Sequence, residues 1–216
     1  MKTKILHALA ILLFAAPSTN AQIKQGNYLL GGSFSYSNSK NVQSNGSSFQ
    51  EFLNSNIQFG KVFKENTVAG VILTYSFTNN PSTNKVNEYS GGIFYRKYKP
   101  LTKGLYFFGE VDGVFRYSKN TQGRFQIGSD GNRYTGNGAT ISFVPGLSYT
   151  VWKKMQMELS MPNLMSISYT GVKNEATFTN ITYITTSKAN NFSASANLNT
   201  SILNNLGIGF KFLLGK

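Results

Sequence analysis

Two carboxylates, Glu110 and Asp112, lie two residues apart in a stretch where apolar and polar residues alternate. This spacing places both side chains on one face of a β-strand, where they could serve as a general acid and base. No further acid–base partner or substrate site can be named. The only histidine, His7, lies in a segment that we expect to be removed, and there is no cysteine. We therefore predict no enzymatic activity, no metal site and no cofactor.

The first 21 residues have the pattern of a secretory signal peptide. Lys2 and Lys4 give a basic start, residues 5–16 are apolar, and a run of small residues ends at Ala21. We predict cleavage after Ala21, which leaves residues 22–216 as a single domain. Because no cysteine can carry a lipid or form a disulfide, stability has to come from burial and from closure of a sheet.

The dominant sequence period beyond residue 22 is two, which indicates β-strands. Only 13% of the residues are charged and 40% are hydrophobic, and no apolar run outside the N-terminus reaches the length of a membrane helix. Abundant Asn, Ser, Thr and Gly make a helical bundle untenable. Eight alternating segments are predicted, over residues 27–37, 50–60, 67–78, 86–97, 105–117, 139–152, 155–170 and some part of 191–214.

Each segment has an apolar and a polar face. The fourth is the least regular, because Phe94 falls on its polar face, and Pro162 predicts a bulge or break in the seventh. Aromatic residues gather near the segment ends, as in the interfacial girdles of membrane barrels: Tyr28, Tyr36, Phe59, Phe77, Tyr95, Phe107, Tyr117, Tyr149, Trp152, Tyr169 and Phe212.

The connections between segments alternate in length. Short ones cover residues 61–66, 98–103 and 153–154, and longer ones cover residues 38–49, 79–85, 119–138 and 171–190. The longer ones contain the turn dipeptides Asn45-Gly46, Asp130-Gly131 and Asn137-Gly138. An even number of strands with short turns at one end and long loops at the other is typical of a transmembrane β-barrel. We predict an all-β, eight-stranded, antiparallel up-and-down barrel whose apolar face meets lipid.

The chain resembles the small outer-membrane β-barrels of Gram-negative bacteria, the OmpA/OmpX/OmpW-like "porin family" proteins. The resemblance rests on the signal segment, the eight alternating segments, the central hairpin of residues 91–110 and the closing residues 206–212, and it covers residues 22–216. It implies an outer-membrane location and insertion by the outer-membrane barrel assembly machinery. The implied role is structural or binding: a scaffold for surface loops, adhesion, or envelope integrity.

Charged residues on the polar face should point into the barrel, since an Arg or Lys facing lipid at the midplane costs roughly 2–4 kcal/mol. We expect them to form a paired and mainly structural interior cluster. A gating cluster or a lining for small ions is the functional alternative. The residues are Glu88, Arg96, Glu110, Asp112, Arg116, Glu158 and Lys211.

The net charge is +13, or +11 without Lys2 and Lys4. Because lysines gather at the short turns, the excess favours contact with anionic headgroups and gives no indication of nucleic-acid binding. In the longer connections, cations that could contact lipopolysaccharide phosphates, or simply be solvated, are Lys119, Arg124, Arg133, Lys173 and Lys188. The expected partners are thus outer-membrane lipid, lipopolysaccharide and a surface ligand, bound by a monomer.

Two further functions and one further fold stay open. A narrow channel could pass small or hydrophobic solutes, although eight strands leave an interior that side chains fill. A lipid-modifying enzyme lacks the usual nucleophile and base. A soluble, secreted β-barrel or β-sandwich that binds a ligand would bury the apolar face as its core, which distinguishes it from a membrane barrel.

Overall fold

Alternating side chains and frequent Gly, Ser and Thr produce long antiparallel strands in the computed structural model. It describes residues 23–43, 46–80, 84–122, 131–161, 164–178, 183–196 and 207–215. The signal peptide predicted over residues 1–21 lies outside these ranges. The strands are β1 (Tyr28–Gln43), β2 (Gly46–Lys64), β3 (Thr67–Asn80), β4 (Asn84–Thr102), β5 (Leu105–Gln122), β6 (Gly131–Trp152), β7 (Met155–Ser160), β8 (Met165–Phe178), β9 (Tyr183–Ala196) and β10 (Gly207–Leu214).

The ten strands occupy the eight positions of a closed antiparallel barrel. Strands β1 to β6 pair in chain order, and β6 then pairs with β7 at one end and with β8 at the other. Strands β7 and β8 are therefore two parts of the seventh position, and β9 and β10 are two parts of the eighth. The barrel closes because β10 pairs with both β7 and β1. The predicted eight-stranded barrel is thus confirmed.

The closing ladder is short in the described part of the chain. Strand β10 pairs with residues 28–32 of β1, whereas β9 pairs only with β8 and the rest of β1 only with β2. The seventh position is divided between Ser160 and Met165, and Pro162, where the sequence predicts a bulge or break, lies outside the described residues. Among the residues that are described, no helix is long and apolar enough to cross a membrane.

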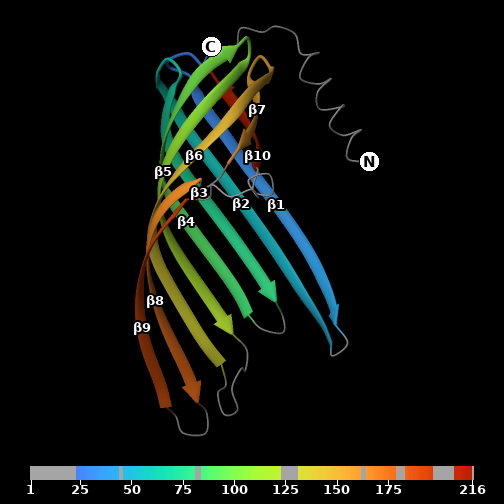
Figure 1. Cartoon of the computed structure of the whole chain (residues 1–216), viewed down its shortest axis with the longest axis vertical. Coiled ribbons are helices and arrows are strands. Elements are labelled where there is room, and N and C mark those ends of the chain that lie inside the picture. The colour runs from blue at the N-terminus through green and yellow to red at the C-terminus, as the bar shows by residue number, and fades with distance from the viewer. Residues whose placement is uncertain are drawn as a thin grey trace.

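The two ends of the barrel differ (Figure 1). Strands β2–β3, β4–β5 and β6–β7 are joined by two-residue turns at the end that also holds β10, which we call the turn end. Asn66 and Gly104 adopt positive φ angles of 58° and 77° in two of these turns. At the opposite end, the hairpin end, four strand pairs project: β1–β2, β3–β4, β5–β6 and β8–β9.

The predicted longer connections are wrong in extent, because strand pairing continues through most of their residues. The β1–β2 ladder runs to Gln43 and Gly46, and the β8–β9 ladder runs to Phe178 and Tyr183. Asn137-Gly138, predicted as a turn, lies inside β6, paired with β5 and β8. These stretches carry few apolar residues in alternation, so no period of two marked them as strands in the sequence.

The apolar face of the strands is on the outside. Phe115 is 75% exposed, Ile93 68% and Leu73 61%, and the other strands expose their apolar face in the same way. A soluble β-protein has the opposite arrangement, because it would bury these apolar residues and expose the polar face. The alternative fold, a barrel or sandwich that buries this apolar face as its core, is therefore wrong.

Inside the barrel, the turn end is filled by apolar side chains. Phe94, which breaks the alternation of its segment, is one of these buried residues; the others include Ile23, Leu29, Val62, Val68, Tyr98, Tyr106, Phe108 and Leu213. Ile23 joins them because its carbonyl accepts a hydrogen bond from the Asn66 amide at 3.0 Å. The interior changes from this apolar core to polar and charged groups further along the axis.

Candidate functional site

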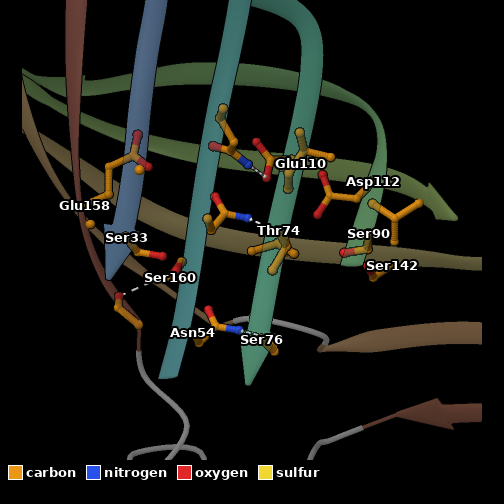
Figure 2. A pocket seen from close by; sticks show the side chains of 18 of the residues that line it. Ser33, Asn54, Thr74, Ser76, Ser90, Glu110, Asp112, Ser142, Glu158 and Ser160 are labelled. Carbon is orange, nitrogen blue, oxygen red and sulfur yellow. Dashed lines mark hydrogen bonds between the residues drawn. The ribbon is translucent and has the colours of Figure 1, made fainter. Parts of the chain in front are cut away.

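The interior above the apolar core holds a cavity of about 430 Å³ (Figure 2). Its walls carry Ser, Thr and Asn side chains from several strands, and its floor is charged. All seven charged residues proposed for the interior line it: Glu88, Arg96, Glu110, Asp112, Arg116, Glu158 and Lys211. The structure therefore brings together residues that are up to 123 positions apart in the chain, from Glu88 to Lys211.

Arg96 is the centre of the charged floor. Its Nε donates to Glu110 Oε2 at 2.6 Å, and its Nη1 donates to Glu158 Oε1 at 2.6 Å and to the hydroxyl of Tyr98 at 2.9 Å. The guanidinium also lies 4.3 Å from the ring centre of Phe108. Arg96, Glu110 and Glu158 are all buried. Hydrogen-bonded pairing of this kind is what lets buried charges persist.

Lys211 from β10 completes the network. Its ammonium donates to Gln58 Oε1 and lies 4.0 Å from Glu158 Oε2. The Gln58 amide then donates to Glu110 Oε1 at 3.0 Å, which links both carboxylates to both cations. Arg96 and Lys211 together balance Glu110 and Glu158, so the four-residue floor has no net charge.

Arg116 and Glu88 form a separate pair nearer the hairpin end, with 3.2 Å between Arg116 Nε and Glu88 Oε1. The Arg116 side chain is 48% exposed and that of Glu88 is 28% exposed. An ion pair this accessible to water contributes little stability. The seven residues thus divide into a buried floor, an accessible pair and one remaining carboxylate.

Asp112 is that remaining carboxylate. It is only 8% exposed, and its Oδ1 has no hydrogen-bond partner among the described residues. Figure 2 shows its carboxyl group beside Glu110 at the cavity. Asp112 is therefore the one member of the seven that forms no ion pair with a described residue.

Hydrogen-bonded pairs line the cavity wall between β2 and β3. Asn54 donates to Ser76 at 2.7 Å, and Asn56 donates to Thr74 at 3.0 Å, as Figure 2 shows for the first pair. Sequence reasoning missed Gln58, Tyr98 and Phe108 as members of the site. Phe108 lies two residues from Glu110 on the same face of β5, and Gln58 alternates with apolar residues on the polar face of β2. These are the signals that could have identified them.

The cations proposed to contact lipopolysaccharide do not lie in this cavity. Lys119, Arg133, Lys173 and Lys188 are exposed on strands near the hairpin end, and Arg124 lies outside the described residues. Lys173 Nζ donates to Glu175 Oε1 at 2.5 Å, and this hydrogen bond lowers the pKa of the Glu175 carboxyl.

The two carboxylates of the floor are both engaged in short hydrogen bonds. Each buried carboxylate of the floor already accepts from Arg96, so neither is placed to transfer a proton to a bound molecule. Within the described ranges, no group of three or more His, Cys, Asp or Glu side chains is placed to hold a metal ion. The unoccupied volume lies above the floor, among hydroxyl and amide groups.

No family model matches the chain, and neither does any curated protein. Among solved structures, the chain is similar to the outer membrane protein OprG from Pseudomonas aeruginosa, with a TM-score of 0.51 and 10% identity, over 91% of this chain and 99% of that one. Neisserial surface protein A matches at a TM-score of 0.38 and 14% identity, over 87% of this chain and 97% of that one. The likeness to OprG shows that the fold is that of an outer-membrane β-barrel.

Proposed function

We propose that this protein is an integral outer-membrane β-barrel with a non-enzymatic structural or binding role, a scaffold that displays its hairpin end at the cell surface. The observation that carries the proposal is the belt of exposed apolar side chains around a polar, charged interior. In a membrane, lipid covers such a belt, and pairing between strands satisfies the backbone groups that hydrocarbon cannot.

The filled interior favours a scaffold over a channel. The buried network of Arg96, Glu110 and Glu158 crosses the barrel, and the apolar core fills the turn end beneath it. A solute would have to break short, buried ion pairs and then displace close-packed side chains. The cavity above the floor is therefore a recess rather than part of a continuous pore.

The membrane location is tested by fractionation of expressing cells, followed by gel electrophoresis of boiled and unboiled outer-membrane samples in detergent. A closed barrel keeps its structure in cold detergent, so we expect the unboiled band to migrate differently from the boiled one. A protein found in the soluble fraction, without a mobility change, would contradict the proposal. Mass spectrometry of the same sample checks for an N-terminus at Gln22.

The runner-up function, a narrow channel, is tested by single-channel recording in planar bilayers. We expect no conductance from the parent protein, because the floor is closed. The double variant Arg96→Ala with Arg116→Ala removes the central cation of the floor and the cation of the accessible pair. If the parent protein conducts and this variant changes its conductance, the scaffold proposal is wrong and the channel function takes its place.

A further inference from the structure

A second cavity, of about 320 Å³, lies against β5, β6, β8 and β9 near the hairpin end. Its lining includes Tyr117, Asn137, Gly171, Lys173, Lys188 and Asn190. All six share the outer face, on which Phe115, Tyr169 and Phe192 are exposed. Five of them stand two or four positions from one of these aromatic residues, and Asn137 is paired with Tyr117 and Gly171. The cavity is therefore a hollow on the outside of the barrel, which we call the outer hollow.

The strand register arranges the outer hollow in rows. Phe115, Tyr169 and Phe192 lie in one cross-strand row, and Tyr117, Asn137, Gly171 and Asn190 lie in the next. The third row is Lys119, Thr135, Lys173 and Lys188. Successive rows are about 7 Å apart, at roughly 3.4 Å per residue. The lysines thus stand about one headgroup layer beyond the aromatic rows that would mark the membrane interface.

A glycine opens the middle of the outer hollow. A Cβ atom on Gly171 would lie 2.9 Å from Asn137 Oδ1 and 3.3 Å from Asn190 Oδ1, so a larger residue would fill the space between the two amides. Tyr117 presents an exposed ring beside them. Two amides and an aromatic ring around a small recess suit the hydroxyls and the apolar face of a sugar.

The lysine row lacks the anions needed to balance it. Lys173 and Lys188 are directly opposite each other on β8 and β9, and like charges in this position destabilise a sheet. Lys173 has Glu175 as a partner, whereas no ion pair joins Lys119 or Lys188 to any other described residue. A bound phosphate between Lys173 and Lys188 would relieve their repulsion.

From these observations we infer that the outer hollow binds the phosphorylated sugar of an outer-leaflet glycolipid. The phosphate lies against Lys173 and Lys188, the sugar ring lies over Gly171 between the two asparagines, and the acyl chains extend over Phe115, Tyr169 and Phe192. The volume exceeds that of a phosphate alone, which favours a glycolipid over a simple phospholipid. The inference rests on the proposed outer-membrane location, because only there does the hairpin end meet such a lipid.

The test uses the full protein in detergent and measures binding of a purified acylated glucosamine disaccharide that carries two phosphates, compared with the same lipid after phosphatase treatment. We expect the double variant Lys173→Gln with Lys188→Gln to lose about thirtyfold in affinity for the phosphorylated lipid, in line with two lysines at a charged lipid surface. We expect little change for the dephosphorylated lipid. Gly171→Leu should weaken binding of both, since it fills the recess.

The matched control is Lys61→Gln with Lys97→Gln, which removes two exposed lysines at the turn end. It should change binding less than twofold. Unchanged affinity in the Lys173/Lys188 variant, or equal affinity of the parent for phosphatidylglycerol and the glycolipid, would overturn the inference. Gel mobility of each variant separates the two proposals: a barrel that inserts but binds no glycolipid refutes this inference alone, whereas failure to insert refutes the proposed function.

Discussion

Arg96 and Glu158 are 62 positions apart in the chain, yet Arg96 Nη1 lies 2.6 Å from Glu158 Oε1 in the barrel interior. The contact spans the barrel from β4 to β7, two strands that do not pair with each other. It therefore holds opposite walls together, which a hydrogen-bonded ladder between neighbouring strands does not do.

Substitution Arg96→Gln should lower the free energy of unfolding by about 3–5 kcal/mol, because it leaves Glu110 and Glu158 buried without their shared cation. Urea titration in lipid vesicles, followed by fluorescence of the single tryptophan, measures the change. The matched control, Arg116→Gln, breaks the accessible pair with Glu88 and should cost at most about 1 kcal/mol. Similar losses in both variants would show that burial of the network does not matter.

Substitution Asp112→Asn should raise the free energy of unfolding by about 1 kcal/mol at neutral pH, because it replaces an ionisable carboxyl group, buried beside the like charge of Glu110, by a neutral amide. Glu110→Gln, two residues away on the same face, should act in the opposite direction because Glu110 accepts from Arg96 and Gln58. The same urea titration compares the two. A destabilised Asp112→Asn variant would mean that this carboxylate has a role in holding the floor.

Substitution Gly146→Ala should destabilise the barrel by about 1–3 kcal/mol through overpacking. A Cβ at this position would lie 2.5 Å from both Leu159 O and Phe108 Cζ. Gly113→Ala is the control, since a Cβ there meets nothing within 4 Å. The temperature at which the unboiled band loses its mobility difference measures the stability of both variants. Equal melting temperatures would contradict the packing described around Phe108.

Substitution Ile93→Arg should cost roughly 2–4 kcal/mol in a bilayer, because Ile93 is exposed in the middle of the apolar belt. Leu101→Arg, on the same strand but at the turn end, should cost no more than about 1 kcal/mol. Folding yield into vesicles measures the difference. If both variants fold equally well, lipid does not cover the belt.

The orientation of side chains was predictable because a period of two is a local property. Glu110 and Asp112 had to share a face, and the exposure of Ile93 and Phe115 followed from their alternation with polar residues. Even Phe94, which broke the alternation, faces inward as its position requires, and it helps to fill the turn end.

The pairing of the interior charges was not predictable in the same way. Which cation meets Glu158 depends on the relative stagger of strands across the whole barrel, and a single sequence does not encode that distance locally. The lengths of the hairpins were missed for a different reason. In residues 38–43 of β1, pairing with β2 continues although the sequence there has no apolar period.

The position of Lys211 on β10 has a consequence for the order of folding. Strand β10 pairs with β7 on one side and with β1 on the other, where residues 28–32 are the partners of residues 210–214, so its placement closes the barrel. Until β10 is in place between β7 and β1, Lys211 does not reach Gln58 on β2, and Glu158 keeps only one of its two cations. Closure of the barrel and neutralisation of its interior charges therefore occur together. A barrel in which only β10 is not yet in place should be a high-energy state that does not accumulate.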